Sequence, residues 1–481
     1  MGPRLRSYEA RPYWRRHLGG FVYVFLLCCM FAGIVAWNNR TMCEQVTPIQ
    51  ALQQAFAKSS PEPILDHGEH QETISLKSAD TTTANATFSP DDVLIMFKTG
   101  ASTMWHRAPM HLATTLANRT LTPHIAFYSD LAGTIGGHPV VDVLANASAK
   151  LKASPDFEYW HLLRRSVRDY NTYVDGEDRD APALVGGWRL DKYKFLPLAA
   201  HAAATFPDKK WYVFVEDDTF FFLEPFLAWL ARGFDWRDPV LVGGPASRLG
   251  EDFVHGGSGF ALSQGAMRRS FLADPRLADK WDDYSLEQGC GDHILSHVLA
   301  TKGVHRARNE KDEMPLQAYG LRDLNVAKWN WCSPLFTLHH VHQSDVSALY
   351  EWEQKFRARK GRGVAPRYSD VFREFIGPHI DQEVREDWDN GADWRHFAAK
   401  EEIERGENLS EDERRQRPWF SADACREACR SEKVCMMWKY SDDNCYLSDV
   451  VKRGHRFSSE MRVKSGWMLD RIRTLENLGC E

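Results

Sequence analysis

The sequence has no basic stripe and no basic arm, and its formal net charge is only −6 over 481 residues. Nucleic acid is therefore not expected as a partner, because proteins that bind it cluster lysine and arginine against the phosphates. Internal repeats are absent as well. The chain does contain 43% hydrophobic residues, enough for a sizeable core, and its length suits about two to four domains.

One long apolar run, residues 19–37, contains no charged residue and has about the length that a bilayer requires. Residues 1–18 before it hold several arginines and a single acidic residue, Glu9. This bias keeps a short tail in the cytoplasm and sends the remaining chain across the membrane. A cleaved signal peptide is the alternative, but its apolar core is normally shorter and ends at a small-x-small site, which is poor here. We expect an uncleaved, single-pass type II anchor.

Cysteines crowd near the C-terminus, where four lie between residues 425 and 445. This density indicates a disulfide-stapled module in an oxidising compartment rather than a cytosolic protein. Zinc binding is the weaker alternative, because the stretch has no CxxC pair and no matching pair of histidines. The predicted compartment is the lumen of the secretory pathway.

Short apolar runs alternate with helical stretches after residue 90, which predicts an α/β layer architecture. The expected buried strands are residues 93–97, 124–130, 211–215 and 240–244, and the expected helices include residues 112–116 and 197–206. Residues 38–89 have no periodic apolar face and are interpreted as a flexible stem. The strongly charged residues 351–417 are interpreted as solvated helices and a linker to the cysteine module, residues 418–481.

The acidic triplet Glu216-Asp217-Asp218 directly follows the expected strand 211–215. Ligands of open parallel sheets bind beyond the carboxyl ends of the strands, and clustered carboxylates there need a cation. Hard divalent cations suit such oxygen ligands and complete their coordination with phosphate oxygens. The spacing predicts one carboxylate on the metal and one directed at a ribose or bound water. A surface turn is the alternative, and the apolar strand before the triplet favours the metal site.

Two segments further along contain glycine next to polar residues. Gly257, Ser258 and Gly259 belong to a glycine-rich run whose backbone can approach a sugar closely, although hairpin turns look similar. Asp292 follows a glycine-broken turn and is expected at or near the N-terminus of a helix. Spacing alone favours a helix-capping role for it.

Histidines and lysines supply further candidates. His339, His340 and His342 offer imidazole nitrogen as a third protein ligand beside carboxylates, although one or two of them are expected to be ordinary histidines. Lys192 and Lys194 precede the acidic strand and can offset the charge of a diphosphate. A solvated helix face is the alternative for the lysines.

Taken together, these motifs resemble glycosyltransferase family 31, in the branch of Fringe and core-1 β1,3-galactosyltransferase and in its fungal form. The resemblance covers residues 92–353. Its elements occur in family order: Lys98-Thr99-Gly100, Tyr128-Ser129-Asp130, Trp188 with Lys192-x-Lys194, the acidic triplet, Gly256-Gly257-Ser258-Gly259-Phe260, Asp292 and the late histidines. Ordered motifs are more specific than fold analogy, which does not establish function.

The resemblance implies a GT-A domain over residues 90–350 that uses Mn²⁺ and a UDP-sugar donor and inverts the anomeric carbon. It implies a glycan or glycoprotein acceptor and a Golgi or ER membrane location, and it favours galactose or an N-acetylhexosamine in β1,3 linkage. Donor-binding positions are then Lys98, Thr99, Ser129, Asp130, Lys192, Lys194, Glu216, Asp217, Gly257, Ser258 and Gly259. Asp218 matches the principal metal carboxylate, and Glu216 stands where many members have Asp. Asp292 matches the general base, and His339 or His340 matches the metal histidine, with His342 as a rival.

The cysteine module resembles the core of PAN/apple domains, which bind proteins or carbohydrates. This resemblance implies that Cys425 pairs with Cys445 and Cys429 with Cys435, while Cys480 is left with Cys332, Cys290 or Cys43 as partners. The module can recruit an acceptor or partner, or serve as a structural cap. The alternative function for the whole chain is a non-catalytic lectin-like or cochaperone-like protein that binds through this module.

Overall fold

The computed structural model describes residues 88–118, 120–168, 187–248, 250–307, 315–404, 409–456 and 462–480. The predicted anchor, residues 19–37, and nearly all of the predicted stem lie outside these ranges. Within the described ranges, no helix is both long enough and apolar enough to cross a membrane.

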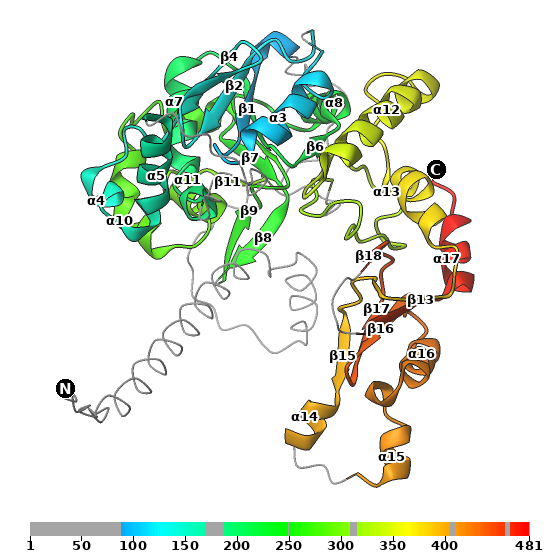
Figure 1. The fold of residues 1–481 in the computed structure, drawn as a ribbon. Coiled ribbons are helices and arrows are strands. Elements are labelled where there is room, and N and C mark those ends of the chain that lie inside the picture. The colour runs from blue at the N-terminus through cyan, green and yellow to red at the C-terminus, as the bar shows by residue number, and fades with distance from the viewer. Residues whose placement is uncertain are drawn as a thin grey trace, which may run out of the picture. The chain divides into compact units, whose positions relative to one another are not determined.

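A mixed sheet of eight strands forms the centre of the first part of the chain, in the order β11-β7-β10-β5-β1-β2-β4-β3 (Figure 1). Its strands are β1 (Val93–Lys98), β2 (Ile125–Ser129), β3 (Gly133–Ile135), β4 (His138–Asp142), β5 (Trp211–Glu216), β7 (Val240–Gly243), β10 (Phe260–Ser263) and β11 (His305–Arg306). Strands β5, β1, β2 and β4 run parallel, and β10 runs antiparallel to β5. The predicted α/β class is therefore confirmed.

Helices cover both faces of this sheet because the buried β1 directs alternate side chains to opposite sides. Leu94 and Met96 join one core, which also receives side chains of α5 (Glu158–Arg168), α7 (Phe195–Thr205) and α11 (Gly291–Ala300). Ile95 and Phe97 join the other core, with α3 (Met104–Ala113) and α8 (Leu223–Gly233). Figure 1 shows these two sets of helices on opposite sides of the strands.

The predicted strands at residues 93–97, 124–130, 211–215 and 240–244 correspond to β1, β2, β5 and β7. The predicted helix at residues 197–206 corresponds to α7, whereas the one at 112–116 overlaps only the end of α3. Helix α3 begins at Met104, and its buried positions Met104, Ala108 and His111 lie at helical spacing. The remaining α-helices and strands of this part are α4 (Ala149–Lys152), α6 (Gly187–Asp191), β6 (Phe220–Phe221), β8 (Pro245–Arg248), β9 (Glu251–Val254), α9 (Gln264–Arg269), α10 (Asp282–Glu287) and β12 (Thr337–Leu338).

A second sheet of five strands lies in residues 384–480, here named the C-terminal unit, in the order β13-β19-β16-β17-β15. Its elements are β13 (Val384–Glu386), β14 (Trp388–Asp389), β15 (Arg395–Ala398), α14 (Ala399–Glu404), α15 (Glu411–Arg415), α16 (Ala422–Ser431), β16 (Met437–Ser441), β17 (Asn444–Ser448), β18 (His455–Arg456), β19 (Lys464–Trp467) and α17 (Leu469–Glu476). Helices α12 (Gln343–Lys360) and α13 (Tyr368–Val371) precede it.

The segment expected to be solvated helices and linker, residues 351–417, thus contains the second half of α12 but also contributes two strands to this sheet. Strands β13 and β15 are its edges, and charged residues such as Arg395 are typical of edge strands that must not pair further. Their inward side chains, Val384 and Phe397, pack against the buried disulfides.

The disulfides of the C-terminal unit follow the pattern implied by the resemblance. Cys425 is bonded to Cys445 and Cys429 to Cys435, and all four are fully buried. Cys480 is bonded to Cys332, which was one of its three candidate partners.

Candidate functional site

The candidate site lies at the carboxyl ends of the central strands. Strands β1 and β5 are paired in register, so that Lys98 at the end of one lies opposite Glu216 at the end of the other. The chain then turns, and the backbone N–H of Thr219 donates to the carbonyl of Glu216 at 3.1 Å. This turn presents Asp217 and Asp218 beyond the sheet edge, where ligands of such sheets bind.

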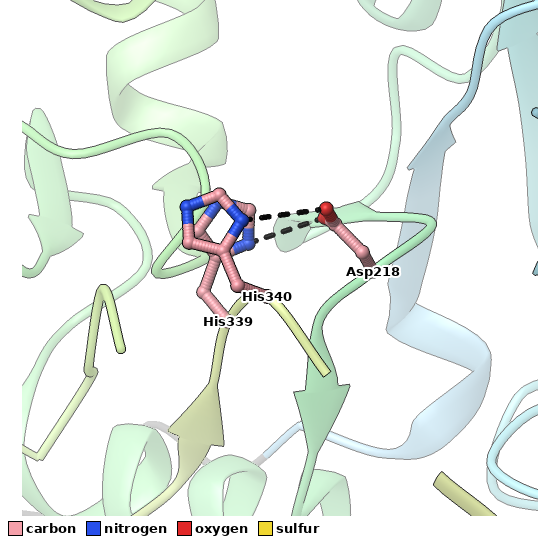
Figure 2. Close-up of side chains that lie close together, drawn as sticks. All are labelled: Asp218, His339 and His340. Atoms are coloured by element: carbon pink, nitrogen blue, oxygen red, sulfur yellow. Dashed lines mark ion pairs between the residues drawn. The ribbon is translucent and has the colours of Figure 1, made fainter. Parts of the chain in front are cut away.

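Asp218 lies against two histidines from a distant part of the chain (Figure 2). His339 Nδ1 is 3.2 Å from Asp218 Oδ1, and His340 Nδ1 is 3.7 Å from Asp218 Oδ2. Among the described residues, these side chains form the one group of three or more His, Cys, Asp or Glu residues whose ligand atoms all lie within 4.8 Å of one another. We call them the Asp218 cluster.

Strand pairing brings the histidines to this place. The two-residue strand β12 pairs with β6, directly after the acidic turn, so that Leu338 lies opposite Phe220. The backbone N–H of Val341 also donates to the carbonyl of Asp218 at 3.0 Å. Between these two attachments, His340 has a left-handed φ of 55°, which histidine adopts more readily than most residues but still infrequently.

Charges in the Asp218 cluster stabilise one another. Burial alone would raise the pKa of Asp218, but His339, His340 and Arg107 outweigh it and hold that pKa well below its ordinary value. Burial likewise would lower the pKa of His339, and the Asp218 carboxylate reverses this and raises it. The mutual stabilisation shows that a cationic partner is favourable next to Asp218.

The donor set of the Asp218 cluster suits a first-row divalent metal such as Mn²⁺, because it combines one carboxylate with two imidazoles. The His339 ring fits at this place because residue 257 is glycine. A Cβ at Gly257 would clash with the ring, since it would lie only 2.1 Å from His339 Nε2. His342, the rival histidine, is exposed and precedes α12 outside the cluster. Glu216 is also outside it.

Glu216 instead pairs with a lysine. Lys98 Nζ lies 3.0 Å from Glu216 Oε1 and 2.5 Å from Asp191 Oδ2, and the Lys98 side chain is only 4% exposed. Burial raises the pKa of Glu216, and Asp191 and Asp218 add to this effect against the opposing charge of Lys98. Asp191 behaves differently: burial would raise its pKa, but Lys98 and Lys194 outweigh burial and lower it.

Asp217 is held by side chains from the turn after β1 and from the first turn of α3. Its Oδ2 accepts 2.6 Å hydrogen bonds from the hydroxyls of Thr99 and Thr103, and Arg107 lies 3.0 Å from its Oδ1. Arg107 also reaches Asp218 Oδ2 at 3.1 Å. One guanidinium therefore bridges two of the three acidic side chains.

The other predicted donor-binding residues near β2 form a buried ion pair. Lys194 Nζ lies 3.0 Å from Asp130 Oδ2, and Ser129 Oγ donates to Asp130 Oδ1 at 3.2 Å. Lys194 also donates to the carbonyl of Thr99 at 3.2 Å and so fixes the turn after β1. Lys192 points elsewhere, since it donates to the carbonyl of Gln288 at 2.9 Å and pairs with Asp156.

Asp292 lies in the first turn of α11, near the helix N-terminus as expected. Its Oδ2 accepts a 2.7 Å hydrogen bond from the backbone N–H of Gly256, and its Oδ1 accepts one from its neighbour His293. Burial raises the pKa of Asp292 against these hydrogen bonds, which makes its carboxylate a stronger base. Cys290 occupies the N-cap position of α11 without a side-chain capping hydrogen bond, and the Asp292 carboxylate bonds to the glycine loop.

The glycine-rich run 256–260 connects Asp292 to the Asp218 cluster. Gly256 contacts Asp292, Gly257 lies against His339, and the Gly257 carbonyl accepts a 2.7 Å hydrogen bond from Thr219. Ser258 Oγ donates within the loop to the carbonyl of His255, and Gly259 has a φ of +74°, which favours glycine.

Three residues of this site were not predicted from the sequence: Asp191, Arg107 and His255. Asp191 lies within the Trp188 to Lys194 segment, and its carboxylate pairs with Lys98 and Lys194. Arg107 is one helical turn after Thr103, the N-cap residue of α3, and both side chains contact Asp217. His255 lies beside His339, and burial, reinforced by the charges of both cluster histidines, lowers its pKa to about 3.

Comparison of the sequence with protein-family models gave no match, and comparison with curated proteins found none that is similar. Function is therefore inferred from the chemistry of the site and from the order of the motifs.

Proposed function

We propose that the protein is an inverting glycosyltransferase of the GT-A type that transfers a hexose from a UDP-sugar to a hydroxyl of a glycan or glycoprotein. The observation that carries the proposal is the arrangement of Asp218, His339 and His340 at a strand end, with Asp292 joined to the same site through residues 256–257. A metal site and a separate, partly buried carboxylate are the two parts that such a transfer needs.

In this proposal, the Asp218 cluster holds Mn²⁺, which would neutralise the departing diphosphate. Lys98 is a buried cation beside the cluster that pairs with Glu216 and Asp191 and so holds these two carboxylates at the edge of the site. Asp217 keeps Arg107 and the turn after β1 in place, and so shapes the donor pocket.

Asp292 is the proposed general base. Its raised pKa favours acceptance of a proton from the attacking hydroxyl, and its hydrogen bond from Gly256 keeps the carboxylate oriented toward the glycine loop. One direct displacement without a covalent intermediate gives inversion at the anomeric carbon.

The proposal includes the location and the sugar implied by the sequence: a type II protein of the Golgi or ER membrane with its catalytic domain in the lumen, transferring galactose in β1,3 linkage. The disulfides of the C-terminal unit support an oxidising compartment.

The test is to incubate the purified full chain with Mn²⁺ and a panel of UDP-sugars and to follow release of UDP, with glycan acceptors added. Asp218→Asn is the matched variant, since it keeps the size of the side chain but removes the charge. Donor-dependent UDP release that is lost in this variant supports the proposal. If UDP is released from none of the UDP-sugars, a binding protein of the lectin-like or cochaperone-like kind is favoured instead.

A further inference from the structure

The segment that carries the two histidines shares a hydrophobic core with the C-terminal unit. Leu338 and Val341 bracket the histidines and are at most 3% exposed. Their core also contains Trp467 of β19 and Leu475 of α17, both from the end of the chain. The C-terminal unit therefore has two cores: this shared one, and a smaller one of its own around the buried disulfides Cys425–Cys445 and Cys429–Cys435.

Backbone hydrogen bonds join the two parts as well. Val326 and Val451 exchange a pair of bonds, with N···O distances of 3.0 and 2.7 Å, and the N–H of Gly454 donates to the carbonyl of Arg322 at 2.9 Å. The partner residues Arg322 and Val326 belong to residues 315–342, here named the histidine loop, which also contains His339 and His340. Within this loop, the N–H of His339 donates to the carbonyl of Tyr319 at 3.2 Å.

A covalent bond completes the attachment. The Cys332–Cys480 disulfide connects the histidine loop to the C-terminus across 148 positions. Two hydrogen bonds to the last residues of the chain accompany the disulfide. Trp331 Nε1 donates to the carbonyl of Leu478 at 3.2 Å, and Arg367 donates to the carbonyl of Cys480 at 3.1 Å. Figure 1 shows α17 beside α13, and Arg373 of the adjoining helical turn donates to the carbonyl of Glu476.

Strand β12 needs such support. It has only two residues, and it leads into His340, whose left-handed backbone is unfavourable by itself. A metal ligand keeps its geometry only when the surrounding packing fixes it, and loss of supporting interactions typically weakens metal binding about 10- to 100-fold.

We infer that the C-terminal unit is a positioning element of the metal site: through the Cys332–Cys480 disulfide and the core around α17, it holds the loop that presents His339 and His340. The inference rests on the proposed function for the metal itself. It assigns a role to the end of the chain that differs from recruitment of an acceptor, because the residues involved are buried against the histidine loop.

The experiment compares two disulfide variants of the full chain, Cys332→Ser with Cys480→Ser, and Cys429→Ser with Cys435→Ser. Each variant lacks one disulfide: the first lacks the bond between the histidine loop and the C-terminal unit, and the second lacks a bond within the C-terminal unit. Mn²⁺ affinity is measured by titration calorimetry, and folding by circular dichroism. We expect the first variant to bind Mn²⁺ about tenfold or more weakly, and the second to bind like the wild type. Equal affinity in the two variants, whether unchanged or equally reduced, would overturn the inference.

A second pair keeps all disulfides and covers the case in which a cysteine variant does not fold. Leu475→Ala truncates the shared core, and Leu447→Ala truncates the separate core around the disulfides; both side chains are buried. Weaker Mn²⁺ binding in Leu475→Ala alone supports the inference, and equal effects refute it. If the wild type binds no Mn²⁺, the proposed function fails instead, and the inference falls with it.

Discussion

Gly257→Ala is the most direct test of the candidate metal site, because its effect follows from geometry alone. The added Cβ would lie 2.1 Å from His339 Nε2, 2.4 Å from its Cδ2 and 2.5 Å from its Cε1. Ordinary contact begins near 3.4 Å, so the imidazole must retreat by more than about 1 Å. His339 is 5% exposed and held by Asp218 and Thr219, so it cannot retreat without breaking these contacts.

A displacement of this size in a positioned group can reduce turnover about 10²-fold. We therefore expect Gly257→Ala to lose about two orders of magnitude in UDP release and to require more Mn²⁺ for half-maximal activity. The protein should stay folded, since overpacking typically costs about 1–3 kcal/mol. Gly233→Ala is the control, because its Cβ would meet nothing within 4 Å. Wild-type activity and Mn²⁺ requirement in Gly257→Ala would refute the assignment of His339.

The remaining predictions concern single side chains. Asp218→Asn should abolish Mn²⁺ binding in calorimetry while the thermal unfolding curve stays cooperative; full binding would contradict the cluster. Asp292→Asn should leave UDP and Mn²⁺ binding intact but remove transfer, which a comparison of calorimetry with product formation detects. Burial raises the pKa of Glu353 from 4.5 to about 7, with Glu224 adding to the rise and Arg357 opposing it. The native state thus binds the extra proton, so stability should fall as pH rises from about 4.5 to 7, by up to about 3 kcal/mol. Glu353→Gln should flatten this slope in urea denaturation, and an unchanged slope would show that Glu353 is not responsible.

The strands of the central sheet were predictable because buried parallel strands are continuous apolar runs, as in β1 and β5. The strands β13 and β15 were not, because short edge strands carry charged residues that look like solvated linker. The hydrophobic pattern of a sequence indicates burial where neighbouring positions form an apolar run or a regular apolar face. It does not detect burial against a partner from elsewhere in the chain.

The same limit applies to the site. The acidic turn and the late histidines each stand out in the sequence, and the structure brings Asp218, His339 and His340 together. The pairing of Glu216 with Lys98 was not foreseen, because it depends on the register of β1 against β5. A one-residue change of register would have directed the lysine to the opposite face.

At position 340, the left-handed backbone and the proposed metal-binding role favour different residues. Glycine would adopt a φ of 55° at no steric cost, so a sequence selected for stability alone would carry glycine there. Glycine has no imidazole, however, and the cluster would lose a donor. A search for thermostable variants of this chain should therefore return glycine or asparagine at position 340 among its hits, and such hits should be rejected before they are combined.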